Sequence, residues 1–420
     1  MNTFTLSLLL RLPLIVLALA ACFYSAIVAG AIHLAQSSNP ESIRRAIQLI
    51  PFSPDFFLKL DSALPQSSPQ LLRQALTLNP FQSEAWIRLG IDAEMRERNP
   101  SRAETYYRKA AEIDRMYLPE GTLANFYDRQ QDAPKFFEAA KRALALTPYD
   151  SRPILAEAAM LARNPDEVLA IVPDRPHVLF DYLNMLLANG NVEQIAVVAL
   201  RAASHRPDPV TGPPELTDTW RGNLGSVEDR LLQSARREDA IHIWTAMQRH
   251  GWVSAPAPSL SNPIPTGSLH EPVFGHGFGW WRPQVSGVLS DQFPSLGKLT
   301  FSFDGTEAET CRLLQRFIPV AGAKSYNFNW QAESLDLQGS SGLRWRIYPV
   351  LPENDKDRVF LTSPEVLKNG QQDGSWQFVT PAGWRVALVT LEYERPLGQV
   401  RAEGSVSLSN ISITEPAAVN

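Results

Sequence analysis

Residues 75–90 read ALTLNPFQSEAWIRLG, and their first six letters return in a related form as ALALTP at residues 143–148. Pro80 and Pro148, which end the two copies, lie 68 residues apart. A degenerate middle copy, AAEID at residues 110–114, stands between them. An apolar pattern that recurs at a fixed period of this size predicts stacked helical units rather than one globular core.

The 68-residue spacing is twice the 34-residue period of tetratricopeptide repeats. Trp86, Leu89 and Gly90 fit the W-x2-L-G opening of the first helix of that repeat. The stretch from about Ser67 to Arg163 therefore resembles the tetratricopeptide repeat family, which implies helix pairs whose concave face binds a protein partner. The resemblance implies packing roles for the signature positions, which are Ala75, Pro80, Trp86, Leu89, Gly90, Ala103, Tyr107, Leu123, Ala124, Tyr127, Ala143 and Pro148.

Less regular helix pairs are expected on both sides of these repeats. They cover residues 52–78 upstream, and residues 151–172 and 177–204 downstream. One more helix, at about Val227–His250, is expected to close the stack. Each pair alone leaves an apolar face exposed, so several must stack to be stable. The expected all-α solenoid spans residues 37–251.

A hydrophobic stretch precedes the repeats. Residues 12–35 contain no Asp, Glu, Lys or Arg, and they are long enough to cross a bilayer as a helix. We expect residues 1–36 to be an uncleaved signal-anchor of a single-pass inner-membrane protein, with the later domains periplasmic or otherwise outside the cytoplasm. Two other fates stay open, which are cleavage near the AGA pattern at residues 29–31 and lipidation of Cys22.

Composition excludes several classes of protein. The chain has 39 Lys and Arg against 44 Asp and Glu, and no basic stripe that would favour nucleic-acid binding. Its two cysteines, Cys22 and Cys311, exclude a disulfide-stapled fold and a cysteine-rich zinc site. We expect neither a cofactor nor a bound metal.

The character of the sequence changes after the helical region. Residues 252–272 are rich in proline, which predicts a semi-extended linker. From residue 273 to residue 416 short alternating runs follow; in one of them Tyr326, Phe328 and Trp330 alternate with asparagines. Such runs, punctuated by glycine and proline, predict an all-β jelly-roll sandwich.

The order of motifs in this domain resembles galactose-binding-like and carbohydrate-binding-module sandwiches, as found in bacterial exopolysaccharide-associated repeat proteins. The motifs are GFGWWR at residues 277–282, FSFDG at 301–305, YNFNW at 326–330 and SGLRW at 341–345. The resemblance implies that aromatic faces pack on sugar C–H groups while polar groups bind hydroxyls. The candidate ligand-binding residues are Trp280, Trp281, Arg282, Trp345, Arg346 and Trp384.

Adjacent Trp280 and Trp281 cannot both face the core of a regular strand, because successive side chains point to opposite faces. One of the two is therefore expected on the surface. The competing interpretation places most tryptophans in the core, since a two-sheet sandwich needs large inward residues.

No pattern for catalysis is present. His-Glu-x-x-His, Cys-x-x-Cys and Gly-x-Ser-x-Gly do not occur. Glu392 and Glu394 share one face of an expected strand, and we interpret them as a solvated face rather than as the acid pair of a glycosidase. The chain is therefore predicted to be a non-enzyme.

Three functions are compatible with this organisation. The first is a membrane-anchored scaffold in envelope polysaccharide biosynthesis or export, whose repeats bind a protein and whose sandwich binds glycan. The second is a purely protein-binding assembly factor with a structural sandwich. The third is an accessory to a glycan-processing hydrolase, or an unrecognised hydrolase.

Overall fold

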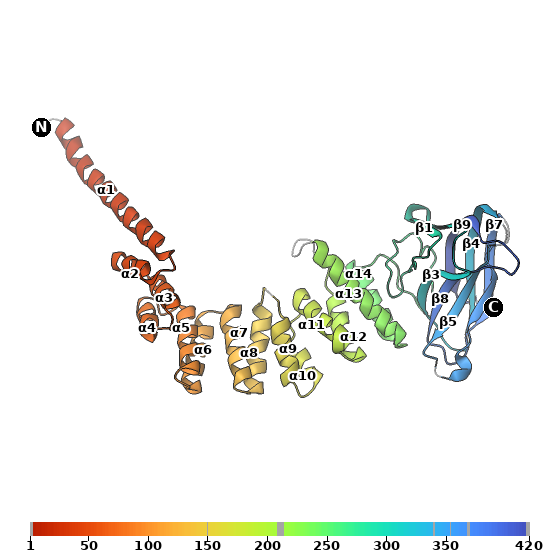
Figure 1. The fold of residues 1–420 in the computed structure, drawn as a ribbon, viewed down its shortest axis with the longest axis horizontal. Coiled ribbons are helices and arrows are strands. Elements are labelled where there is room, and N and C mark those ends of the chain that lie inside the picture. Colours follow the sequence, from red (N-terminus) through yellow and green to blue (C-terminus); the bar gives the residue numbers. More distant parts are fainter. Residues whose placement is uncertain are drawn as a thin grey trace. The chain divides into compact units, whose positions relative to one another are not determined.

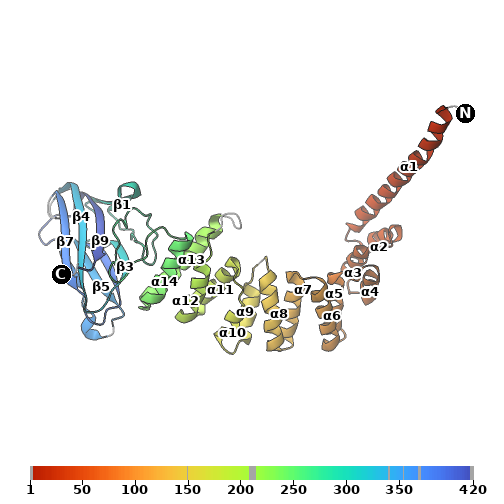
Figure 2. The same ribbon diagram turned by 180° about the vertical axis from the view of Figure 1, so that it is seen from behind.

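The computed structural model describes residues 3–148, 150–207, 214–338, 341–352, 354–367 and 370–416. The order of elements is one long apolar helix, a series of short helices, and an antiparallel two-sheet β-sandwich (Figure 1; Figure 2 shows the reverse side). The predicted fold class is therefore confirmed. The chain divides into two compact units, Met1–Pro173 and Asp174–Asn420.

Helix α1 (Thr3–Ala35) is the apolar segment. Its Leu14–Ala35 stretch is long and apolar enough to cross a membrane, and most of its side chains are exposed. Only the end of α1 is covered, because Ala31 and Ala35 pack with Ala46 and Phe56 of the next two helices. The structure thus provides one N-terminal apolar helix, consistent with a signal sequence or an anchor.

The other helices of the first unit form antiparallel pairs. Asn39, Asn99, Asp132 and Asn164 each precede a helix and accept a hydrogen bond from a backbone N–H of its first turn. Prolines at the first helical positions lose no hydrogen bond there. The helices are α2 (Pro40–Leu49), α3 (Pro54–Ala63), α4 (Pro69–Leu78), α5 (Ser83–Met95), α6 (Pro100–Ile113), α7 (Tyr117–Arg129), α8 (Ala133–Leu146), α9 (Arg152–Leu161) and α10 (Pro165–Ile171).

The repeat signature positions lie where these helices pack. Trp86 is partly buried and donates its indole N–H to the carbonyl of Pro80, at 3.0 Å. Pro80 and Pro148 are exposed in the turns that follow α4 and α8. The remaining signature residues are all buried, namely Ala75, Leu89, Gly90, Ala103, Tyr107, Leu123, Ala124, Tyr127 and Ala143.

The second unit begins with four more helices, α11 (Pro176–Asn189), α12 (Val192–Ala203), α13 (Pro214–Gln233) and α14 (Arg237–His250). The prediction of one helix at Val227–His250 is wrong, because the chain turns between α13 and α14. Ala235 adopts a φ of 56° there, and its N–H and that of Arg236 bond back to the last turn of α13. Neither glycine nor proline marks this turn in the sequence.

The proline-rich residues 252–272 contain no helix and no named strand, yet they are packed. Trp252 is buried and donates its indole N–H to the carbonyl of His205. Ile264 forms a β-bridge with Ile413 in the last strand. The segment therefore joins the final helices to the sandwich through burial and backbone hydrogen bonds.

The sandwich contains a five-stranded and a four-stranded antiparallel sheet. The strand orders are β1-β2-β9-β4-β7 and β3-β8-β5-β6. The strands are β1 (Val288–Phe293), β2 (Lys298–Asp304), β3 (Thr310–Pro319), β4 (Ser325–Gln338), β5 (Leu343–Val350), β6 (Leu361–Glu365), β7 (Gln371–Val379), β8 (Val386–Glu394) and β9 (Glu403–Thr414).

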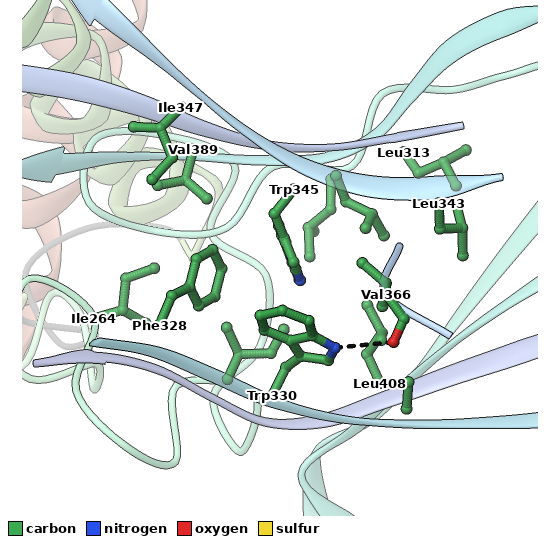
Figure 3. Packing of buried hydrophobic residues seen from close by; sticks show 14 of the residues in the cluster. Ile264, Leu313, Phe328, Trp330, Leu343, Trp345, Ile347, Val366, Val389 and Leu408 are labelled. Atoms are coloured by element: carbon green, nitrogen blue, oxygen red, sulfur yellow. Dashed lines mark hydrogen bonds between the residues drawn. The ribbon is translucent and has the colours of Figure 1, made fainter. Parts of the chain in front are cut away.

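Large aromatic side chains from both sheets fill the space between them. Phe328, Trp330 and Trp345 are buried together, and the indole N–H of Trp330 donates to the carbonyl of Val366 at 3.1 Å (Figure 3). Tyr326, Phe328 and Trp330 point inward while the intervening asparagines are partly exposed. The period-2 alternation of β4 is as the sequence predicts.

Candidate functional site

The outer face of the four-stranded sheet carries the most elaborate polar cluster of the described sandwich. On β5, Leu343, Trp345 and Ile347 point into the core. The residues that alternate with them therefore point outward, because successive side chains of a strand point to opposite faces. These outward residues are Arg344, Arg346 and Tyr348, and they face the outward side chains of β8.

Glu392 of β8 lies at the centre of this cluster. Its carboxylate accepts hydrogen bonds from Arg312 Nε at 3.0 Å, Arg346 Nη1 at 2.7 Å, Thr390 Oγ1 at 3.0 Å and Tyr348 Oη at 3.1 Å. Burial raises the pKa of this carboxyl, but these hydrogen bonds outweigh burial and hold the pKa below its usual value. Glu392 therefore stays ionised and fixes two arginines from neighbouring strands in place.

Aromatic rings cover the two arginines. The Arg312 guanidinium lies 5.2 Å from the ring centre of Tyr348, and that of Arg346 lies 5.6 Å from the ring centre of Phe360. The Tyr348 and Phe360 rings are 5.3 Å apart and inclined by 30°. Phe360 is 51% exposed, so part of its surface is available to a ligand. Cation–π contacts of this kind hold both partners in a defined orientation.

Trp281 extends the same face at its β3 edge. Its backbone forms a bridge with Gln315, with N–H···O distances of 2.8 and 2.9 Å. Directly paired residues project to the same side of a sheet. Because Gln315 pairs with Thr390, and Thr390 with Arg346, these four residues form one row across the outer face. Trp281 is 52% exposed.

We call this surface the platform and define it as Trp281, Arg312, Arg346, Tyr348, Phe360 and Glu392. A hollow of about 20 Å³ adjoins it, lined by Trp281, Gln315, Phe317, Leu388 and His276 among others. His276 Nδ1 lies 2.7 Å from Asp229 Oδ2 of α13, which fixes the loop that borders the hollow. The platform thus has a rigid edge as well as a rigid centre.

The predicted ligand-binding residues separate into two groups. Trp281 and Arg346 lie on the platform. Trp280, Trp345 and Trp384 are buried, so they present no ring face to a ligand from solvent. Their large inward side chains fill the space between the sheets, as the competing interpretation holds.

Arg282 lies beyond Trp281 and donates to the carbonyl of Ser290. As expected for adjacent residues of extended chain, Trp280 faces inward and Trp281 outward.

Two aspects of the platform did not follow from sequence reasoning. Arg312, Tyr348 and Phe360 were missed, although Tyr348 continues the Arg344 and Arg346 alternation and could have been found from it. The interpretation of Glu392 as solvated is wrong, since it is 7% exposed and fully hydrogen-bonded. Only Glu394, half-exposed and paired with Arg346, resembles that expectation.

Replacing Glu392 with glutamine should lower the free energy of unfolding at pH 7 by about 1–2 kcal/mol, because charge-assisted hydrogen bonds to Arg312 and Arg346 are lost. A carboxyl with a lowered pKa adds stability above its unfolded pKa and loses it as pH falls through its folded pKa. The difference between wild type and Glu392→Gln should therefore disappear in acid. Urea unfolding between pH 7 and pH 3 measures it.

Glu394→Gln is the matched control, because an exposed ion pair contributes under about 1 kcal/mol. Equal losses in the two variants would contradict the central role of Glu392.

The helical repeats of the first unit offer a different kind of surface. The first helices of three successive pairs carry exposed apolar side chains, namely Ile91 on α5, Leu118 on α7 and Met160 on α9. Consecutive pairs are also joined by charge, since Arg129 of α7 binds Glu94 of α5 at 2.8 Å. Stacked helix pairs of this kind suit contact with another protein.

Among the described residues, no group of three or more His, Cys, Asp or Glu side chains is placed to hold a metal ion.

The solved structures that the chain resembles at low identity include the following two. One is a CBM4 structure, matched over 33% of this chain and 88% of that chain, with 11% identity and a TM-score of 0.24. The other is the pilF protein of Pseudomonas aeruginosa, matched over 42% of this chain and 89% of that chain, with 15% identity and a TM-score of 0.29. No family model and no curated protein matches the chain. The function proposed below therefore rests on the residues of this chain.

Proposed function

We propose that this protein is a non-catalytic, membrane-anchored scaffold whose sandwich binds glycan at the platform and whose helical repeats bind a protein partner. The observation that carries the glycan half is the Glu392 cluster, in which two arginines and two aromatic rings are held in fixed positions beside exposed Trp281. The chain would act outside the cytoplasm, in envelope polysaccharide biosynthesis or export.

The chemistry of the platform suits a sugar chain. Exposed aromatic rings bury large area against sugar C–H groups at little cost in side-chain entropy. The guanidinium N–H groups of Arg312 and Arg346 that Glu392 and Glu394 leave unused can donate to hydroxyls or to the carboxylates of acidic sugars. Since both arginines are already ordered, little further entropy is lost when a ligand binds.

The platform supports binding rather than hydrolysis. A general acid needs a raised pKa near neutral pH, whereas Glu392 has a lowered pKa and four hydrogen-bond donors. Its lone pairs are committed to holding neighbouring side chains. This is the reason for proposing a non-enzyme.

Trp281→Ala and Phe360→Ala should each weaken glycan binding by about tenfold or more. Each removes an exposed aromatic ring, and a few such side chains supply most of the binding free energy of an interface. The measurement is retention of the detergent-solubilised full chain on immobilised acidic and neutral envelope polysaccharides. Phe293→Ala is the control, since Phe293 is a comparably exposed aromatic of the other sheet.

If wild type is not retained on any polysaccharide, the glycan half of the proposal is wrong. The burial of Trp280, Trp345 and Trp384 would then be explained by the alternative function, a protein-binding assembly factor whose sandwich is structural. Retention that Trp281→Ala and Phe360→Ala leave unchanged would place the glycan elsewhere than on the platform.

A further inference from the structure

Two arginines that have no hydrogen-bond or ion-pair partner among the described residues line one small cavity where α13 meets the sandwich. Arg221 comes from α13 and Arg316 from β3, and both border a cavity of about 50 Å³. The other lining residues include Trp244, Ser268, Glu271 and Trp280. All of them belong to the Asp174–Asn420 unit.

Arg316 occupies a position that normally takes an apolar residue. It lies between core residues Leu314 and Ile318 on β3, pairs with Val389 and is 3% exposed. Its guanidinium lies 5.4 Å from the ring centre of Trp280, and its Nε is buried without a partner. Burial lowers the pKa of Arg316 to about 9. A buried charge of this kind is destabilising unless an opposite charge compensates it.

Arg221 approaches the same cavity from the helix. Its guanidinium lies 5.1 Å from the ring centre of Phe274, and its Nε is also buried without a partner. The two guanidinium groups therefore rest on aromatic rings that orient them, while their N–H donors stay unused. Arginine presents those donors in a planar fork that matches the oxygens of a carboxylate, sulfate or phosphate.

The acidic side chains near the cavity do not pair with the two arginines, so the positive charges of the arginines are not compensated. Glu271 is the one carboxylate among the lining residues, and it accepts a hydrogen bond from Ser254 instead of pairing with either arginine. Glu228 is buried nearby against Gly277 and Trp244. Burial, and then the charge of Asp229, raise the pKa of Glu228 well above its usual value, which favours its neutral form. Asp229 itself is bound to His276 and to the N–H of Gly277.

We infer that this cavity is a binding site for one small oxyanion, held between Arg221 of α13 and Arg316 of β3. A single water needs roughly 10–15 Å³ of such space, so 50 Å³ accommodates a phosphate or sulfate but no sugar ring. Ser268 accepts the indole N–H of Trp280, which leaves its hydroxyl proton available as a neutral donor. The bound anion joins α13 to β3 and so connects the last helices to the sandwich.

This inference does not rest on the glycan proposal. The cavity contains none of the six platform residues, although Arg316 and Gly279 line both the cavity and the hollow that adjoins the platform. Equilibrium dialysis of the detergent-solubilised full chain against radiolabelled phosphate, and separately sulfate, tests it at constant ionic strength. We expect one anion per chain. Arg221→Met and Arg316→Met should each weaken anion binding by about tenfold or more. Each substitution removes the N–H donors of one guanidinium group and replaces the arginine with an unbranched side chain of similar volume.

Two further variants sharpen the test. Arg230→Met is the matched control on α13, because Arg230 already donates to the carbonyls of Leu187 and Gly190, and binding should be unchanged. Glu271→Gln should tighten binding, since it removes the one negative charge that lines the cavity. Absence of saturable binding, or equal weakening by Arg230→Met and Arg316→Met, would overturn the site.

Thermal unfolding gives a second readout that does not depend on dialysis. Phosphate should raise the Tm of wild type and leave that of Arg316→Met unchanged. Arg316→Met itself should fold, because replacing an uncompensated buried charge with an apolar residue is neutral or stabilising. Equal phosphate effects on the two proteins would refute the inference.

Discussion

Trp345→Ala should lower the free energy of unfolding of the sandwich by about 3–5 kcal/mol, the range for removing a large buried aromatic. Trp345 is fully buried and has the rings of Trp280, Phe328 and Trp330 at 6.2, 4.9 and 6.5 Å between centres. No neighbour can fill the resulting space without leaving its own contacts. Urea unfolding of the full chain, followed by tryptophan fluorescence, measures the change.

A pair of phenylalanine variants provides the control. The indole N–H of Trp345 is buried without a partner, whereas that of Trp330 donates to the carbonyl of Val366. Trp330→Phe should therefore cost about 1 kcal/mol more than Trp345→Phe, because only the former breaks a hydrogen bond. If Trp345→Phe proved the more damaging of the two, the assignment of hydrogen bonds in this core would be incorrect.

Gly90→Ala should destabilise the Met1–Pro173 unit by about 2–3 kcal/mol through overpacking. A Cβ on Gly90 would lie 2.5 Å from Cε1 of Tyr107, which is buried on the facing helix α6. Moving that ring also breaks the hydrogen bond from the Tyr107 hydroxyl to Glu94, and Glu94 in turn binds Arg129 of the next repeat. The effect of the substitution therefore extends from α5 to α7.

Gly121→Ala in the following repeat is the comparison. The nearest atom to a Cβ at Gly121 is 3.4 Å away, on the Tyr117 ring, which is an ordinary contact. Alanine is the better helix former by about 1 kcal/mol, so Gly121→Ala should be neutral or stabilising. Helical circular dichroism during urea unfolding distinguishes the two variants, and similar losses at both glycines would contradict close helix packing at Gly90.

The local pattern of apolar and polar residues predicted the helices and strands in which buried positions recur at a regular spacing along the chain. The spacing of Pro80 and Pro148 indicated paired helices, and the alternation of Tyr326, Phe328 and Trp330 indicated a strand with one buried face. The adjacency of Trp280 and Trp281 predicted that one ring would face outward. These inferences succeed because the period of side-chain direction is a property of the helix or strand itself.

The failures concern places where distant segments determine a residue's surroundings. The turn at Ala235 has no glycine or proline signal, and it depends on carbonyls of the preceding helix. The sequence predicts a solvent-exposed side chain for Glu392, because its hydrogen-bond partners Arg312 and Arg346 lie 80 and 46 residues away in sequence. The composition of the proline-rich residues 252–272 predicts a linker. Their packing against α14 and β9 depends on tertiary contacts that composition does not reveal.

The apolar helix, the helical repeats and the β character of the last domain could all be predicted, since each follows from hydrophobic periodicity over neighbouring residues. The burial of Trp280, Trp345 and Trp384 and the exposure of Trp281 depend on how the two sheets pack. The tertiary structure also brought Arg312, Arg346 and Glu392 from three strands into the platform, and Arg221 and Arg316 to one cavity. The physical reason is that strand pairing and domain packing join residues far apart in the chain, and no local period records which segments will meet.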